Sequence, residues 1–242
     1  MAQFDTNYQS APAAGTQTGY DAGLRTHMLR VYNYMASGVL LTGIIAMMLG
    51  DALMVNAELR QTLYGGGLGL VIMLAPLAFV LVMSFGVNKM SAPTLKLIFF
   101  AFAATMGVSL ASIFLVYTGG SIARTFFITA ASFGALSLYG YTTKKDLSGM
   151  RTFLMMGLFG LIIAGIVNIF LQSNMMQFIT SVIGVLVFAG FTAYDTQRIK
   201  NEYFQLAGTG LLAKAAVMSA LKLYLDFVNL FMYLLRFLGN RN

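Results

Sequence analysis

Seven long apolar segments, each about as long as a membrane-crossing helix, dominate this chain. The hydrocarbon core of a bilayer is about 30 Å thick and needs roughly 20 apolar residues at 1.5 Å per residue. A transmembrane barrel would instead show alternating segments of about 10 residues. We therefore expect an all-α integral membrane protein, a bundle of seven transmembrane helices. The expected spans are Val31–Gly50, Leu68–Val87, Leu95–Tyr117, Ile122–Tyr141, Thr152–Leu171, Met175–Tyr194 and a last helix within Leu211–Leu238.

The composition agrees with lipid as the solvent of this chain. Only 10% of its 242 residues are charged, whereas about a quarter are charged in an ordinary soluble domain. The absence of Cys excludes a disulfide scaffold, a thiolate metal site and a Cys nucleophile. Residues 1–24 are polar without an apolar period, so we expect a disordered cytoplasmic tail before a transmembrane domain of residues 25–242.

Basic residues are distributed unevenly over the connections between the spans, and this gives an orientation. With a cytoplasmic N-terminus, ten basic residues fall on the cytoplasmic side and only two on the other side. The net charge of +7 is therefore an orientation signal and does not indicate nucleic-acid binding. The ten are Arg25, Arg30, Lys89, Lys96, Lys144, Lys145, Arg151, Arg198, Lys200 and Lys214, and the two are Arg60 and Arg124.

Small residues recur every four positions in two of the spans, a pattern that lets helix backbones approach closely in lipid. One stripe is Ala103, Gly107 and Ala111. The other runs from Gly160 to Asn168, whose amide can hydrogen-bond to a neighbouring helix. We expect both stripes to serve packing within the bundle.

Two of the eight acidic residues fall at membrane depth, and the other six lie in the tail or in connections, Glu202 among them. Asp195 ends the sixth apolar segment, and Asp226 lies inside the last one. A carboxylate inside the membrane costs several kcal/mol unless it is paired, protonated or facing water, so both are functional candidates. The structural alternatives are an ion pair of Asp226 with Lys222, four residues earlier, and an interfacial position of Asp195 near Arg198.

The functional interpretation is that Asp195 and Asp226 meet between the sixth and seventh helices, reached by a water-filled dip from the cytoplasm. Two close carboxylates cannot both ionise at low cost, so the pair would share one proton near physiological pH. Loss of that proton would place two like charges in a low-dielectric site and push the helices apart. The same carboxylate oxygens are candidate ligands for Ca²⁺.

The segments around these aspartates resemble the transmembrane Bax inhibitor motif family, also called the Bax inhibitor-1 family. The resemblance covers residues 136–239 by motif and the first half of the chain by its pattern of spans. The polar tail and short loops resemble the bacterial branch. The matching segments are Gly-Phe-Thr-Ala-Tyr-Asp-Thr-Gln-Arg-Ile at 190–199, Leu-Tyr-Leu-Asp-Phe-Val-Asn-Leu-Phe at 223–231, Lys-Lys-Asp-Leu at 144–147, Gly-Ile-Val-Asn-Ile-Phe at 165–170 and Leu-Leu-Arg-Phe-Leu-Gly at 234–239.

The resemblance implies a seven-helix protein of the bacterial cytoplasmic membrane with its last helix near the centre. It also implies a pH-sensitive calcium leak that needs no cofactor and is controlled by an aspartate pair, which corresponds to Asp195 and Asp226. In some members an Arg of the second span helps to latch this pair. The second span here holds no charge, so Lys89 or Lys222 would have to substitute for that Arg. Further supporting candidates are Tyr194, Asn229 and Asn168.

Three alternatives to a channel differ in how well the residues fit them. Bacterial members of the family have been linked to restraint of a membrane-bound quality-control protease, so a non-transporting regulator that binds such a partner is the main alternative. An intramembrane aspartyl protease uses Gly-x-Gly-Asp, whereas Leu-Tyr-Leu-Asp ends at Asp226, and the single histidine, His27, precedes the first span. We therefore expect no enzymatic activity. A proton-coupled solute carrier would need a larger polar cluster than this sequence offers.

Overall fold

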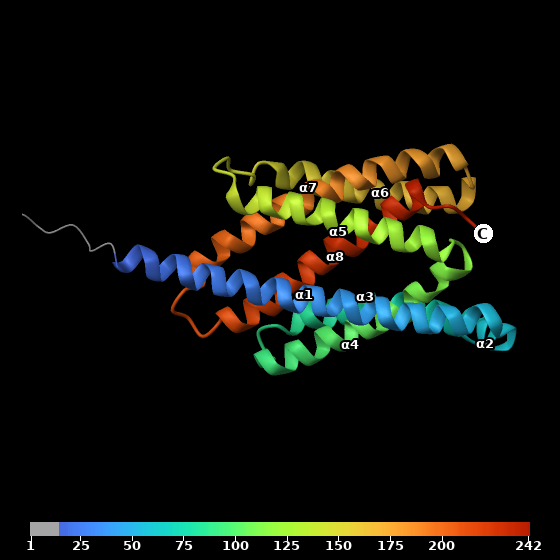
Figure 1. Cartoon of the computed structure of the whole chain (residues 1–242), viewed down its shortest axis with the longest axis horizontal. Coiled ribbons are helices and arrows are strands. Elements are labelled where there is room, and N and C mark those ends of the chain that lie inside the picture. Colours follow the sequence, from blue (N-terminus) through green and yellow to red (C-terminus); the bar gives the residue numbers. More distant parts are fainter. Residues whose placement is uncertain (1–14) are drawn as a thin grey trace, which may run out of the picture.

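Seven membrane-spanning helices make up almost the whole of the computed structural model, which describes the backbone of residues 15–242 and the side chains from residue 22 (Figure 1). Within these described residues, seven helices are long and apolar enough to cross a membrane. The expected all-α seven-span bundle is thereby confirmed. The spanning helices are α1 (Gly15–Val55), α3 (Gly67–Gly86), α4 (Ala92–Leu110), α5 (Gly119–Thr142), α6 (Met150–Leu171), α7 (Asn174–Leu206) and α8 (Leu212–Leu238).

Three boundaries differ from the sequence expectation. Helix α1 begins at Gly15, so residues 15–24 continue the first helix, while residues 1–14 of the expected tail lie outside the described residues. The third span tightens into a 3₁₀ turn, η1 (Ala111–Leu115), before it ends. Helix α7 runs twelve residues past the expected end at Tyr194, because residues 195–206 contain no Gly or Pro and keep one face buried.

A short helix that hydropathy does not reveal, α2 (Ala57–Tyr64), connects the first two spans. Its N-cap is Asn56, whose side chain accepts a hydrogen bond from the Leu59 amide at 2.9 Å. Similar caps begin the longer helices: Ser91 accepts from Thr94 before α4, and Ser173 accepts from Met176 before α7. These local signals fix where α2, α4 and α7 start.

Helix α8 lies at the centre of the bundle, as expected for the last helix. In its most apolar window 72% of the residues are buried within the protein, against 11% for α3 and α6. It packs against α7, α1, α5 and α4, which surround it (Figure 1). A shift of α8 would therefore alter its packing against four other helices.

Helices α1, α4 and α8 are joined by close packing and a buried hydroxyl chain. A Cβ at Gly107 would lie 2.8 Å from the Thr42 carbonyl oxygen, so only glycine lets α4 approach α1 this closely. The Tyr224 hydroxyl of α8 bonds Thr42 Oγ1 at 2.6 Å, and Thr42 donates to the Ala103 carbonyl at 2.7 Å. The first expected small-residue stripe does pack within the bundle, since Ala103 and Ala111 are also buried.

The second stripe was expected to pack within the bundle, and that expectation is wrong. Gly160 is exposed, and a Cβ added at this position would meet no heavy atom within 4 Å. The close approaches to α7 come from other glycines: Gly157 of α6 meets Val187, and Gly140 of α5 lies directly against the backbone of Ala193. The stripe pattern did not show which side of α6 faces the bundle.

The two ends of the bundle differ in charge. The basic end holds the start of α1 and the connections between α3 and α4, α5 and α6, and α7 and α8, and it carries Lys89, Lys144, Lys145, Arg151 and Lys214. The C-terminus lies at the opposite end, where Asn240 accepts from the Thr118 amide at 3.1 Å and donates to Ser121 Oγ at 2.9 Å (Figure 1). The Asn242 amide also donates to the Val116 carbonyl at 3.0 Å. Helix α8 therefore crosses the whole bundle.

Candidate functional site

Asp195 and Asp226 come together where α7 and α8 pack against each other. Both side chains are buried, with exposed fractions of 8% and 6%. Their carboxyl groups interact directly, side chain to side chain. Among the described residues, none makes a hydrogen bond to Asp226 Oδ2, which is fully enclosed. The structure thus brings the two predicted aspartates into one buried site and leaves one carboxyl oxygen without a partner.

An unpartnered carboxyl oxygen in such a site has a direct chemical consequence. A buried polar atom without a hydrogen bond costs about 1–3 kcal/mol, and more if it is charged. A proton held between Asp195 and Asp226 removes this cost, because one carboxyl then donates to the other. The arrangement is able to hold a shared proton.

Lys222 is the cation beside the pair, one helical turn before Asp226 on α8. Its Nζ lies 4.0 Å from Glu202 Oε2, and its charge also acts on Asp195 and Asp226. Among the residues whose side chains are described, the contact between Lys222 and Glu202 is the one ion pair. Asp226 is therefore not the direct ion-pair partner of Lys222. The structural alternative for Asp226 is wrong in this respect.

Glu202 is a member of the site that sequence reasoning placed in a connection between helices. It lies on α7, because that helix continues to Leu206. Its Oε2 atom is enclosed and, at 4.0 Å from Lys222 Nζ, too far away for a hydrogen bond. The signal available in the sequence was the spacing from Asp195, since seven residues along a helix return to the same face.

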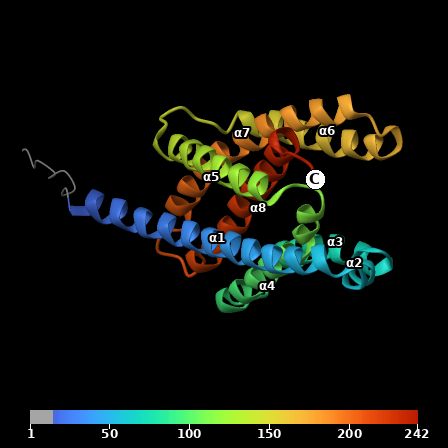
Figure 2. The ribbon, with the colours of Figure 1, turned by 45° about the vertical axis from the view of Figure 1, so that its right-hand side comes forward.

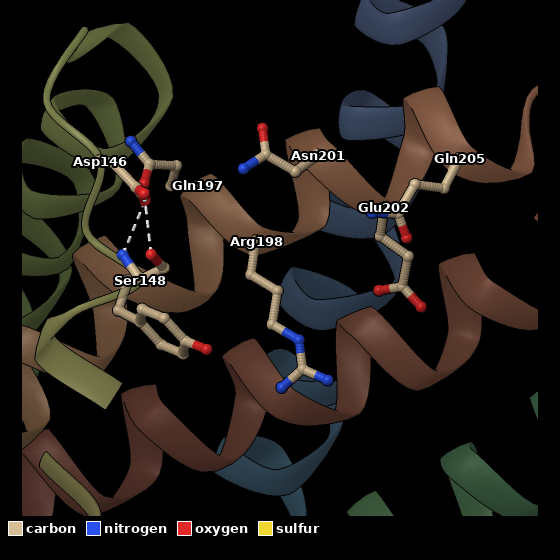
Figure 3. Close-up of a pocket in the computed structure, with 8 residues that line it drawn as sticks. Asp146, Ser148, Gln197, Arg198, Asn201, Glu202 and Gln205 are labelled. Atoms are coloured by element: carbon tan, nitrogen blue, oxygen red, sulfur yellow. Dashed lines mark hydrogen bonds between the residues drawn. The ribbon is translucent and has the colours of Figure 1, made fainter. Parts of the chain in front are cut away.

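A polar cavity of about 230 Å³ lies along α7 at the basic end (Figure 3). One face of α7 supplies most of its lining, and Asp146 and Ser148 from the connection between α5 and α6 supply the rest. In Figure 3 the side chains of Arg198 and Glu202 leave α7 on the same side. The residues from α7 are Tyr194, Gln197, Arg198, Asn201, Glu202 and Gln205.

Glu202 links this cavity to the buried pair. It lines the cavity, and it also contacts Lys222, whose charge acts on both aspartates. Asp195 lies between the cavity residues Tyr194 and Arg198 in sequence but does not line the cavity itself. The cavity therefore extends to Glu202, the carboxylate 4.0 Å from Lys222 Nζ.

Gln197 holds the wall of this cavity in place. Its Oε1 accepts from the Leu147 amide and its Nε2 donates to the Lys145 carbonyl, each at 2.8 Å. Asp146 closes the same turn by accepting from the Ser148 amide at 2.9 Å and the Ser148 hydroxyl at 2.8 Å. These two hydrogen bonds lower the pKa of Asp146 below its usual value. Sequence reasoning missed Gln197, which no spacing rule singles out.

A chain of hydroxyl groups ends next to Asp195. The Tyr32 hydroxyl of α1 bonds Ser137 Oγ of α5 at 2.5 Å, and Ser137 Oγ bonds Thr196 Oγ1 of α7 at 2.9 Å. Thr196 also donates to the Thr192 carbonyl within α7. The chain connects three helices across the bundle at the level of the aspartate pair.

The remaining predicted residues lie at varying distances from the site. Tyr194 is buried and lines the polar cavity, whereas Asn229 donates to the Leu225 carbonyl of its own helix at 2.8 Å. Asn168 caps the turn between α6 and α7 by accepting from the Ser173 amide. Helix α7 starts just after that turn, so the helix rise puts Asn168 about 30 Å along the bundle from Asp195. Asn168 therefore makes no contact with the site.

Lys89 and a bound metal receive little support as parts of this site. Lys89 is exposed in the connection between α3 and α4 and is not among the charges that act on the pair. Among the described residues there is no group of three or more Asp, Glu, His or Cys side chains that could hold a metal ion. Ca²⁺ takes six to eight oxygen ligands, so two carboxyl groups alone do not make a resident calcium site.

The chain is similar over most of its length to several known bacterial proteins and to one family model. The family model described as "Inhibitor of apoptosis-promoting Bax1" matches residues 24–242. The chain is 48% identical over 222 residues to a protein of Rickettsia prowazekii, covering 92% of each chain. It is 45% identical over 223 residues to the inner membrane protein YbhL of Escherichia coli, covering 91% of this chain and 94% of YbhL. A Caulobacter vibrioides protein is 43% identical over 247 aligned positions, covering 99% and 98% of the two chains.

Proposed function

The chain belongs to the Bax inhibitor-1 family of membrane proteins, and we propose that it is a pH-sensitive cation leak of the bacterial inner membrane, controlled by Asp195 and Asp226. The observation that carries this proposal is the direct contact of the two buried carboxyl groups, with Asp226 Oδ2 unpartnered. With one shared proton, the pair joins α7 to the central helix α8. Without it, two like charges in a low-dielectric site push the two helices apart.

The charged neighbours set the pH at which this happens. The charged side chains nearest the pair are Lys222 on α8 and, on α7, Arg198 and Glu202, whose carboxylate lies 4.0 Å from Lys222 Nζ. Lys222 here takes the place of the Arg that some members of the family carry in the second span. The polar cavity beside Glu202 supplies the water through which protons and ions reach the pair.

Calcium is the ion that we propose to move along this route, with a cytoplasmic N-terminus as the orientation. Carboxylate oxygens are hard ligands suited to Ca²⁺, and a pair of them attracts the ion without completing its coordination shell. Such a site favours passage over retention. The excess of basic residues at the end that holds the polar cavity supports a cytoplasmic position of this end.

Flux measurements on the purified protein in liposomes test the proposal. We expect Ca²⁺ entry to rise between pH 6 and pH 8, and to stay low at both pH values in Asp195→Asn and Asp226→Asn, because a neutral amide cannot repel its neighbour. Asp51→Asn, which changes an exposed carboxylate of α1 outside the polar cavity, is the control and should keep the wild-type profile. A wild-type rise in flux in either buried variant would refute proton sharing as the gate.

Lys222→Met gives a second readout of the same gate. Loss of the positive charge makes ionisation of the pair harder, so the pH at half-maximal flux should move upward. A midpoint that stays in place or moves downward would show that Lys222 does not act on the pair.

The alternative function is that of a non-transporting regulator that binds and restrains a membrane-bound quality-control protease. One observation favours it: Gly160 and Gly165 on α6 face away from the bundle with open space around them. Bare glycines of this kind let a helix of another membrane protein approach closely. Liposomes that admit no Ca²⁺ at any pH, together with loss of a protease complex in Gly160→Leu, would favour this function over the leak.

A further inference from the structure

A lipid-facing groove runs between α1 and α5, with the central helix α8 as its floor. Helices α1 and α5 lie apart in both views, and α8 is visible between them (Figures 1 and 2). Both helices pack against α8, whereas they make little contact with each other. Among the described side chains, a hydrogen bond between the Tyr32 and Ser137 hydroxyl groups links them across the groove.

Two cavities occupy this groove and meet at Phe227 of α8, which lines both. The larger, of about 680 Å³, lies toward the basic end between Met28 and Met35 of α1 and Phe133 of α5. The smaller, of about 350 Å³, continues toward the opposite end. Edge-to-face contacts of Phe227 with Phe126 and Phe133, at 5.6 Å and 5.5 Å between ring centroids, hold the floor against α5.

The larger cavity has the length of one bilayer leaflet. Its lining on α1 extends from Arg25 to Ala36, which is about 16 Å by helix rise. Half of a hydrocarbon core of about 30 Å is about 15 Å. Its volume is within the range of about 300–1,000 Å³ that is typical of ligand sites. An acyl chain that enters from the leaflet at the basic end therefore fits along it.

The charge at the mouth of the cavity identifies the headgroup. Arg25 is the charged residue in the lining, and no acidic residue lines either cavity among the described side chains. At the same end Tyr141 lines the cavity and carries the Lys200 ammonium group 5.3 Å from its ring centroid. A guanidinium group in the lining, with a second cation on a residue that lines the same cavity, favours a headgroup with a net negative charge over a neutral or zwitterionic one.

We propose that the groove between α1 and α5 binds one anionic phospholipid from the leaflet at the basic end, with its phosphate at Arg25 and one acyl chain against Phe133 and Phe227. The lipid fills space that the protein leaves open beside its central helix. Phe227 follows Asp226 in α8, so the bound chain contacts the central helix one residue from the aspartate pair. The binding site itself does not depend on the leak function proposed above.

The absence of tryptophan from the chain makes a direct test possible. Leu138→Trp places a fluorescent reporter in the groove at an exposed position, and Phe153→Trp places one on the exposed face of α6 near the same end. Each reporter protein is put into bilayers that contain phosphatidylglycerol or phosphatidylcholine with brominated acyl chains, which quench tryptophan on contact. One basic residue near the surface is worth about 1 kcal/mol, so we expect the preference for phosphatidylglycerol to be about fivefold stronger for the reporter at position 138 than for the one at position 153.

Two variants make the result specific to the groove. Arg25→Gln should remove the preference at position 138 and leave position 153 unchanged. Gly134→Leu fills the open space in the groove, where a built Cβ has no neighbour within 4 Å, and should reduce quenching by both lipids at position 138. Equal quenching by the two lipids, or a preference that survives Arg25→Gln, would overturn the proposal. Absence of quenching at position 138 would overturn it too, because a second copy or another helix would then fill the groove.

Discussion

Replacement of Gly140 by alanine tests the contact that holds α5 against α7, one turn from the aspartate pair. A Cβ at position 140 would lie 2.9 Å from the carbonyl carbon of Ala193 and 3.0 Å from its Cα, and it would overlap the carbonyl oxygen. Ordinary contacts of this kind begin near 3.4 Å. All three atoms belong to the backbone of Ala193, so the clash cannot be relieved by rotation of a side chain.

The expected cost follows from this geometry. The Ala193 carbonyl oxygen is the nearest atom, so the two helices must separate by about 1 Å, and a gap of about 0.5–1 Å forfeits a quarter to a half of the dispersion energy of each contact. Overpacking of this kind costs about 1–3 kcal/mol. The gain in helix propensity from Gly to Ala, up to about 1 kcal/mol, offsets part of it. With about 2–4 °C per kcal/mol for a chain of this size, the Tm should fall by up to about 8 °C.

Thermal unfolding in a mild detergent measures this, with Gly134→Ala as the matched control. Gly134 lies on the same helix, and a Cβ there meets no atom within 4 Å, so this variant gains helix propensity without overpacking. We expect its Tm to equal or exceed that of the wild type. A Tm for Gly140→Ala that is no lower than that of Gly134→Ala would refute the close approach of α5 and α7.

Two further predictions concern hydrogen bonds. Thr42→Val leaves the buried Tyr224 hydroxyl without a partner and should lower the free energy of unfolding by about 1–3 kcal/mol. Tyr224→Phe keeps the bond from Thr42 to the Ala103 carbonyl and should lower it by only about 0.5–1.5 kcal/mol. Thermal unfolding that reverses this order would contradict the hydroxyl chain. The pKa of Asp146 is lowered from 3.8, so its turn is stabilised above that pH and loses this stability as the pH falls through the lowered pKa. Amide exchange in residues 143–149 should therefore accelerate at the acidic end relative to Asp146→Asn, and an equal pH dependence in both proteins would contradict the hydrogen bonds of the turn.

Hydropathy was sufficient to predict seven spans, since lipid imposes a minimum apolar length on every crossing, whereas the central position of the last helix was expected from the family resemblance. It failed where a helix leaves the apolar layer and continues. The extension of α7 beyond Tyr194 is polar on one face, and so Glu202 was assigned to a connection instead of to the site. The short helix α2 was missed for the same reason, because it contains no buried residue and too few apolar ones.

The meeting of Asp195 with Asp226 could be expected because carboxyl groups at membrane depth need a partner. The partner of Lys222 could not be predicted, because the choice between Asp226 and Glu202 depends on how α7 and α8 cross. Which glycines make close contacts with a neighbouring helix also depends on how each helix is rotated about its own axis. The stripe at Gly160 has the spacing that favours packing, whereas the closest backbone approach is at Gly140, which belongs to no such stripe.

The hydrogen bonds of the C-terminal residues make one end of the central helix a fixed pivot. Residues 240–242 fasten α8 to the start of α5, whereas the other end of α8 follows a short connection. Asp226 lies twelve residues from the pivot, about 18 Å, so a tilt of about 10° moves it by about 3 Å. A tilt of α8 about this end would give its largest displacement at the basic end, where Lys214 Nζ donates to the Val87 carbonyl at 3.3 Å. A fusion partner attached after Asn242 would disturb the hydrogen bonds of residues 240–242 that hold this end of α8, whereas one attached at the N-terminus would leave them intact.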